Sequence, residues 1–167
     1  LANKHPRVNI LQPGTGVGGH CIAVDPWFIV SQDTENSKLI RTAREVNDYK
    51  TTWVIDKIKS NIDKCIPKKG IKPKIACLGL AFKANIDDLR ESKALEVVET
   101  LLAEGYEICV VEPNIQSHKN LLILNLLDAI EQADVICVLV KHHEFLQPEV
   151  KDKLIKCEAL DFCGVLS

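Results

Sequence analysis

The residues of clearest chemical potential in this sequence surround a single cysteine, Cys21. Four glycines lie in the run Gly14–Gly19, His20 follows, and Asp25 comes shortly after the cysteine. Glycines admit positive φ and let a ligand approach the backbone closely. If a helix starts here, its dipole and free amides would favour the thiolate of Cys21. The residues therefore predict a nucleophilic thiolate, with a buried and inert thiol as the alternative.

A second polar motif occupies residues 79–92, with the sequence GLAFKANIDDLRES. It joins the end of an expected strand to an expected helix that Ser92 could cap. Ligands of open α/β sheets bind outside the carboxyl ends of the strands. Lys83 and Arg90 are placed there to contact a phosphate, Arg90 by a bidentate fork and Lys83 as a point charge. A solvated loop in which these cations pair with the motif's own aspartates is an equally good interpretation.

Two other polar positions give weaker signals. Glu112 follows the second expected strand, where an acidic residue can bind a ribose hydroxyl, but an ordinary turn is the favoured interpretation. His142, His143 and Glu144 are adjacent, so their side chains diverge. A polar loop is therefore expected there, and the sequence predicts no metal site.

A long helix is predicted between the two motifs, from about Ser37 to Ile66, where apolar residues recur every three or four positions. The pattern is interrupted at Lys50, and Pro67 and Gly70 are expected to end the helix. At 1.5 Å per residue such a helix is roughly 42 Å long. A small domain cannot bury that length, so part of it should pack against another domain or subunit.

The second half of the sequence alternates short apolar runs with helical patterns. Nearly continuous apolar runs are typical of strands buried on both faces of a parallel sheet. Strands are expected at 74–82, 107–111, 134–140 and 159–163, and helices at 92–104 and 115–132. This alternation predicts an α/β fold. Residues 71–167 would form a Rossmann-like three-layer domain with an open parallel sheet, and residues 1–70 would hold the cysteine loop and the long helix.

Composition narrows the classes of protein. A net charge of −2 gives no signal for nucleic-acid binding. No apolar run approaches the ~18–20 residues that span a bilayer, so neither nucleic acid nor membrane is an expected partner. The seven cysteines form no C-x-x-C pair, which favours reduced thiols in a cytoplasmic protein. The sequence lacks methionine and starts at Leu1, so we expect it to be a piece of a longer protein.

Taken together, GVGGHCIAVDPWF and GLAFKANIDDLRES, in this order and with a long helix between them, resemble the UDP-glucose/GDP-mannose dehydrogenase family. The form HCIAVDPWF is most similar to members that oxidise UDP-N-acetyl-D-mannosamine, with UDP-N-acetylglucosamine and UDP-glucose as alternative substrates. The resemblance covers essentially the whole chain. It implies the end of the central region plus the C-terminal UDP-binding domain, with the NAD-binding domain preceding both.

The resemblance implies an NAD-dependent oxidation of the sugar C6 alcohol to a carboxylate. Cys21 would be the nucleophile that forms a thiohemiacetal and then a thioester, and Asp25 would help to orient the hydrolytic water. The piece represented by this sequence would be inactive without its NAD domain. A non-catalytic nucleotide-sugar-binding module is the alternative, and a thiol-dependent hydrolase is a third, although no histidine is well placed as its base.

The resemblance also implies binding roles. Gly18 and Gly19 would contact the sugar, Phe82 and Lys83 would line the uridine-diphosphate site, and Arg7 would reach the substrate site of a neighbouring subunit.

The same resemblance places Arg90 near the NAD cofactor and makes the long helix the seam of a homodimer. Two departures from the family pattern matter. Val24 stands where glucose-type enzymes carry a lysine, which argues against UDP-glucose. Residues 161–164 stand where relatives often carry a basic residue, so phosphate contacts from the last strand are not expected.

Overall fold

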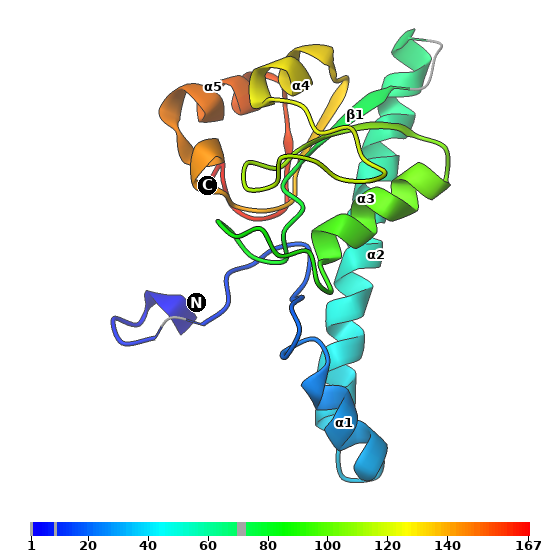
Figure 1. The fold of residues 1–167 in the computed structure, drawn as a ribbon, viewed down its shortest axis with the longest axis vertical. Coiled ribbons are helices and arrows are strands. Elements are labelled where there is room, and N and C mark those ends of the chain that lie inside the picture. Colours follow the sequence, from blue (N-terminus) through cyan, green and yellow to red (C-terminus); the bar gives the residue numbers. More distant parts are fainter. Residues whose placement is uncertain (1, 9, 70–72) are drawn as a thin grey trace.

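The computed structural model describes residues 2–8, 10–69 and 73–167 (Figure 1). Its elements, in chain order, are η1 (Ala2–Lys4), α1 (Asp25–Gln32), α2 (Lys38–Lys69), β1 (Lys74–Leu78), α3 (Lys93–Ala103), β2 (Glu107–Val111), α4 (Leu126–Gln132), β3 (Val135–Val138), η2 (His143–Leu146), α5 (Pro148–Lys156) and β4 (Leu160–Asp161). The alternation of strands and helices expected for the second half of the chain is confirmed.

The sheet is parallel throughout, in the order β2-β1-β3-β4. Its first three strands are apolar and almost fully buried, because helices cover both faces. The chain leaves β1 toward β2 on one side and later returns to β3 on the other. The carboxyl ends of β1 and β3 therefore form the topological switch point, where open α/β sheets bind their ligands.

Alternate residues of each strand enter two separate cores, which gives the predicted three-layer arrangement. Ile75 and Cys77 of β1 pack with α2 and α3, whereas Ala76 and Leu78 pack on the face that carries α4 and α5. Since successive side chains of a strand point to opposite faces, one short apolar strand contributes to both layers.

The predicted long helix is present as α2, which is continuous across Lys50, where only the apolar pattern is interrupted. Lys50 places its Nζ 3.6 Å from the ring centroid of Trp53, on the exposed side of the helix. The helix also continues past Pro67 to Lys69, and Gly70 lies outside the described residues. The helix packs against the sheet only through its second half, in which Val54, Ile55, Ile58 and Ile62 are buried. Figure 1 shows its first half extending, together with α1, beyond the α/β layers.

The expected helix at 115–132 is wrong over most of its length, because only α4 is helical. Asn125 caps α4 by accepting a hydrogen bond from the Asp128 amide at 2.9 Å. Before that cap the chain runs beside β2: the Val110 amide donates to Leu122, and the Leu124 amide donates to Val110. β2 is the edge strand, and this extended segment pairs with both outward-facing backbone groups of its Val110.

The other elements agree with the sequence within a few residues. Ser92 caps α3 by accepting from the Leu95 amide at 3.3 Å. β1, β3 and β4 are shorter than the expected strands. The expected division between residues 70 and 71 falls outside the described residues, and α2 shares its core with the sheet. None of the helices in the described part of the chain is both long and apolar enough to cross a membrane.

Candidate functional site

A cavity of about 710 Å³ opens at the carboxyl ends of β1 and β3, at the switch point of the sheet. Residues 10–18, 81–84 and 139–141 form most of its wall. Its volume lies within the usual range for small-molecule sites. The glycine-rich segment and the 79–92 motif, far apart in the sequence, thus face one common hollow.

Positive charge dominates the cavity wall. Lys83, Lys93 and Lys141 line it, and no carboxylate does so among the described residues. Lys93 is engaged with Asp48 at 3.0 Å and Glu96 at 2.8 Å, and Lys141 donates to a backbone carbonyl. Lys83 is exposed and has no ion-pair partner within the described ranges. The arrangement suits an anionic ligand, and Lys83 is the cation best placed to meet it.

The two motifs touch each other through glycine backbone. A Cβ on Gly18 would lie 2.2 Å from the carbonyl oxygen of Glu91, so no other residue fits at this approach. Gly19 has a φ of +89° and packs under the ring of Phe82. Its amide donates to the carbonyl of Arg90 at 3.1 Å. Contact of Gly18 and Gly19 with a sugar stays a prediction; their role in this structure is to join the motifs.

The glycine-rich segment is anchored on its other side by α2. Asn47 accepts from the Val17 amide at 2.7 Å and donates to the Val17 carbonyl at 3.1 Å. The Thr51 hydroxyl lies 3.4 Å from the carbonyl of Thr15. The Asn47 side chain thus satisfies both the N–H and the C=O of one residue, as a neighbouring strand does in a sheet. This fixes a segment that has no regular secondary structure.

Cys21 lies in the turn that precedes α1, and its side chain is exposed. The Cys21 thiol is therefore not buried, and its role as a nucleophile stays a prediction. α1 starts at Asp25, whose amide donates to the Cys21 carbonyl at 2.8 Å. The helix that was to present Cys21 at its N-terminus thus begins one turn later. Asp25 is itself exposed in the first turn of α1, and its proposed role with a hydrolytic water stays a prediction.

Arg90 is near Cys21 but is already paired. Its Nε lies 3.0 Å from both carboxylate oxygens of Asp88, and its Nη2 lies 2.6 Å from one of them. The hydrogen bonds from Arg90 lower the pKa of Asp88 to about 2. Arg90 also interacts electrostatically with Cys21. Each of the two sequence interpretations of the 79–92 motif therefore fits one of its cations. Arg90 pairs with an aspartate of the motif, whereas Lys83 does not and is left to meet a phosphate.

Arg7 is exposed in the N-terminal segment and does not line the cavity. Of the predicted site residues, Gly18, Phe82 and Lys83 line the cavity, whereas Arg7, Gly19, Cys21, Asp25 and Arg90 do not. Ile22 lines the cavity immediately after Cys21 in the chain. Cys21 thus lies next in the chain to a residue of the cavity wall, and its nucleophilic role stays a prediction.

Sequence reasoning missed a buried polar pair below this site, Glu112 and His142. Both side chains have no exposed surface, and His142 Nε2 lies 3.1 Å from Glu112 Oε2. The ring N–H does not align on the carboxylate well enough for a hydrogen bond, so the contact is mainly electrostatic. Burial by itself raises the pKa of Glu112, but contacts with His142 and with the Leu80 and Asn114 amides lower it to about 2.

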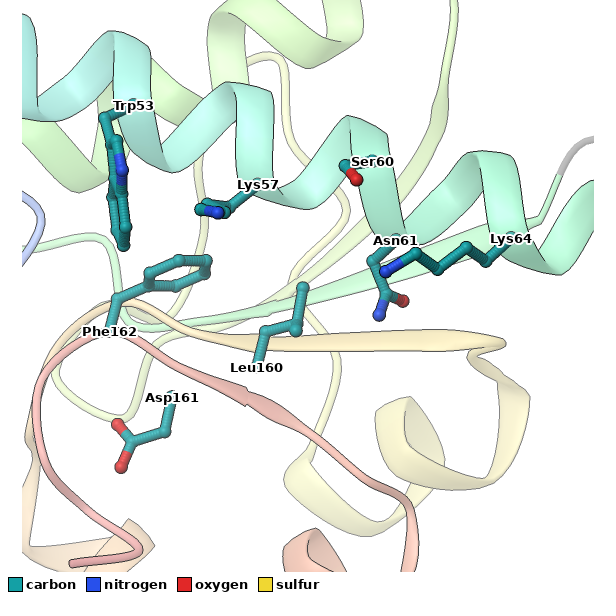
Figure 2. Close-up of a pocket in the computed structure, with 8 residues that line it drawn as sticks. All are labelled: Trp53, Lys57, Ser60, Asn61, Lys64, Leu160, Asp161 and Phe162. Atoms are coloured by element: carbon teal, nitrogen blue, oxygen red, sulfur yellow. The ribbon is translucent and has the colours of Figure 1, made fainter.

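A second hollow, of about 260 Å³, lies between α2 and the end of β4 (Figure 2). Trp53 meets the ring of Phe162 edge-on, with centroids 6.2 Å apart. The carboxylate of Asp161 points away from this hollow and accepts from the amides of Cys163, Gly164 and Leu166. Asp161 therefore folds the C-terminal loop, and the hollow contains neither sequence motif.

The described residues do not form a complete site for a metal or a dinucleotide. None of the described His, Cys, Asp and Glu residues group in threes that could hold a metal ion. β1 leads into a long loop before α3, with no short glycine turn into a helix N-terminus that would cradle a pyrophosphate. Among the described residues, Arg90 alone is a candidate cofactor contact.

Two models of one family match the chain. The UDP-binding domain of the UDP-glucose/GDP-mannose dehydrogenase family matches residues 76–166, and the central domain of the same family matches residues 1–49. The two matched ranges carry the 79–92 motif and the cysteine loop respectively.

Named relatives agree with these matches. The chain is 55% identical to the UDP-N-acetyl-D-mannosamine dehydrogenase of Campylobacter jejuni, over 93% of this chain and 39% of that protein. It is 57% identical to the enzyme of that name from Escherichia coli (strain K12), over 87% of this chain and 37% of that protein. The chain thus spans about two fifths of the length of these relatives.

Solved structures show the same fold. The UDP-D-ManNAc dehydrogenase of Pyrococcus horikoshii matches 99% of this chain and 39% of its own, with a TM-score of 0.74 and 32% identity. The UDP-N-acetyl-mannosamine dehydrogenase Cap5O of Staphylococcus aureus matches 87% of this chain and 34% of its own, with a TM-score of 0.67 and 41% identity.

Proposed function

The chain belongs to the UDP-glucose/GDP-mannose dehydrogenase family, and from that premise we propose that it is the nucleotide-binding and cysteine-bearing part of an NAD-dependent UDP-sugar 6-dehydrogenase. The sugar we propose is N-acetyl-D-mannosamine, which would be converted to its uronic acid. The relatives of highest identity given above bear that activity in their names.

The observation that carries this proposal is the cavity at the switch point. Both family motifs wall it, three lysines line it, and no carboxylate does among the described residues. A diphosphate fits that charge, with Lys83 as its proposed contact and the Phe82 ring packing beside the ligand. The exposed Cys21, next in the chain to a residue of the cavity wall, is then near the sugar end of a bound nucleotide-sugar.

Cys21 would act by holding the sugar covalently. Its thiolate adds to the C6 aldehyde carbon, and the carbonyl oxygen takes up a proton to give a thiohemiacetal. After oxidation of that adduct to a thioester, water attacks the acyl carbon and the thiolate leaves. Asp25, one turn away at the start of α1, would orient the water. The covalent bond prevents escape of the aldehyde between the two oxidations.

NAD, when bound, would accept the hydrides of the two oxidation steps. The described residues provide Arg90 alone as a proposed contact, so we derive no step through the cofactor. Exposure of Arg90 and its electrostatic interaction with Cys21 support a position between the two ligands. The Asp88 pair keeps its guanidinium oriented.

The proposed partner is a second copy of the chain, bound along the first half of α2. Leu39, Val46, Tyr49 and Trp53 form a stripe along one side of this helix, and their side chains are between 37% and 82% exposed. The spacing places them on one face. An apolar stripe of this length on a helix that extends beyond its own domain supports a homodimer seam.

We propose a cytoplasmic enzyme that supplies a uronic acid for a surface polysaccharide. The six cysteines whose side chains are described are all free thiols, in keeping with a reducing compartment. The choice of sugar rests on the relatives rather than on the cavity.

The test has two arms. The chain itself should bind UDP weakly in an isothermal titration, and a folded sample that gives no heat would contradict the proposed site. In the longer protein that contains this chain, Cys21→Ser should abolish NADH production from UDP-N-acetyl-D-mannosamine. Serine keeps the size of the side chain but lacks the nucleophilic thiolate.

The second candidate function is a non-catalytic nucleotide-sugar-binding module. It predicts UDP binding by the chain and no effect of Cys21→Ser on binding or on any NADH signal. The exposure of the Cys21 thiol favours the enzyme.

A further inference from the structure

We propose that the buried pair Glu112 and His142 are positioning residues, which hold residues 80–85 in the shape that presents Phe82 and Lys83 to the nucleotide. The inference rests on the proposed function, because it deepens the role of the same cavity. Neither Glu112 nor His142 lines the cavity. Both would therefore act through the loop and not by touching the ligand.

Glu112 fixes the beginning of the loop. Its Oε2 accepts from the amides of Leu80 at 2.7 Å and Ala81 at 3.1 Å, directly before Phe82. Its Oε1 accepts from the amide of Asn114 at 3.0 Å. A carboxylate at the end of β2 thus binds the backbone that leaves β1. Because the carboxylate is charged, it holds these amide donors more strongly than a neutral acceptor would.

His142 fixes the end of the same loop. Its Nδ1 accepts from the amide of Asn85 at 3.0 Å and lies 3.1 Å from the side-chain nitrogen of Asn114. Because the Asn85 amide brings its hydrogen to Nδ1, that nitrogen carries no proton, and the network assigns the ring proton to Nε2. The protonated Nε2 then faces Glu112 Oε2 at 3.1 Å. One neutral imidazole joins the two clamps.

The loop between the clamps contains the residues of interest. Phe82, Lys83 and Ala84 all line the cavity, and Asn85 takes a left-handed φ of +62°. The Asn85 side chain is held as well, since its Oδ1 accepts from the His143 amide at 2.9 Å. With its backbone fixed on both sides, the turn presents Phe82 and Lys83 in one arrangement rather than many.

The alternative is that the pair merely stabilises the fold. A buried carboxylate with a polar partner is weak evidence for stability, because apolar residues of similar volume are often as stabilising. The two roles differ in what they predict for a variant that stays folded. If the pair positions the loop, loss of the Nδ1 acceptor lowers nucleotide affinity even in a folded variant. If the pair is purely structural, affinity falls only when overall stability falls.

The experiment compares His142→Phe with His142→Asn in the chain, with UDP as the probe in isothermal titration and urea unfolding measured on the same samples. Phenylalanine keeps a ring but loses the acceptor, so UDP affinity should fall about tenfold. Asparagine returns an acceptor close to the place of Nδ1 and should restore affinity to within about threefold of wild type. Leu154→Ala is the control, since Leu154 is fully buried on the α4 and α5 face of the sheet.

The outcomes separate the hypotheses. A folded His142→Phe with wild-type affinity, or a Leu154→Ala that weakens UDP binding as much, overturns the positioning role. If His142→Phe does not fold, His142→Gln replaces it, because glutamine carries its polar atoms to the place of Nε2 and should bind more weakly than His142→Asn. Equal affinity of those two variants overturns the proposal.

Failure of the proposed function can be told apart from failure of the positioning role. If the wild-type chain binds no UDP, the proposed nucleotide site is wrong. Hydrogen exchange then tests whether Glu112 and His142 hold the loop, independently of UDP. The amides of Leu80, Ala81 and Asn85 should lose protection in His142→Phe and keep it in Leu154→Ala. Unchanged protection in His142→Phe overturns the clamp as well.

Discussion

Replacing Glu112 by glutamine should make the stability of the chain less dependent on pH. The pKa of Glu112 is lowered from 4.5 to about 2 by the contacts described above, and its side chain is completely buried. A carboxyl group with a lowered folded-state pKa stabilises the fold above its unfolded pKa, and that contribution is lost as the pH falls through the folded pKa. At about 1.4 kcal/mol per pKa unit, the ionised Glu112 contributes about 3 kcal/mol at neutral pH.

The pH window follows from the same two pKa values. Between pH 7 and about pH 5 the carboxylate is ionised in both states, so its contribution is constant. By pH 3 the unfolded chain has bound the proton while the folded chain largely has not, and about 2 of the 3 kcal/mol have been lost. Glutamine has the shape of the carboxylate but no charge, and its amide NH₂ faces donors already present at this site.

The assay is urea unfolding followed by circular dichroism at pH 7, 5, 4 and 3. The free-energy difference between wild type and Glu112→Gln should be about 3 kcal/mol at pH 7 and about 1 kcal/mol at pH 3. Glu107→Gln is the control, because Glu107 starts the same strand but is exposed and only 3.5 Å from Lys74 in a surface ion pair. Its cost should stay below about 1 kcal/mol at every pH. A Glu112→Gln difference that does not change with pH would refute the reasoning.

Two further predictions concern the helix seam and the glycine contact. Val46→Glu should convert the proposed dimer to a monomer in sedimentation velocity, because it places a charge in the exposed apolar stripe of α2. Thr52→Glu, on another side of α2, should leave the chain a dimer. A monomeric wild-type chain would contradict the proposed seam. Gly18→Ala should lower the free energy of unfolding by about 1–3 kcal/mol, since its Cβ would meet the backbone of Glu91. Gly14→Ala, with nothing within 4 Å of its Cβ, should stay within about 0.5 kcal/mol, and equal costs for the two would argue against the contact.

The sequence predicted helices and strands well where a contact between residues close in the chain, or burial of a short apolar run, decides the local structure. Ser92 caps α3 because its hydroxyl reaches the Leu95 amide, a contact between residues three apart. The apolar runs became buried strands because short, nearly continuous apolar segments suit a parallel sheet that is covered on both faces. The expected helix at 115–132 failed because the free edge of β2 draws residues 122–124 alongside it, and a periodic pattern carries no signal for that.

The candidate site divides in the same way. The sequence was enough to single out Cys21, Lys83 and Arg90 as chemical candidates. It could not decide between the two interpretations of the 79–92 motif, because the pairing of Arg90 with Asp88 and the freedom of Lys83 depend on the conformation of the loop. The sequence also indicated only an ordinary turn at Glu112.

The residue types and their local spacing by themselves determined the α/β fold, the two motifs and the candidate thiol, because these depend on neighbours along the chain. Only the tertiary structure decided that Gly18 packs against Glu91 and that Glu112 meets His142. The reason is geometric: a parallel sheet brings the carboxyl ends of β1, β2 and β3 to one edge, although the residues that follow them are far apart in sequence. Burial at that edge then lowers the dielectric, which makes each polar contact there strong enough to shape the loop above it.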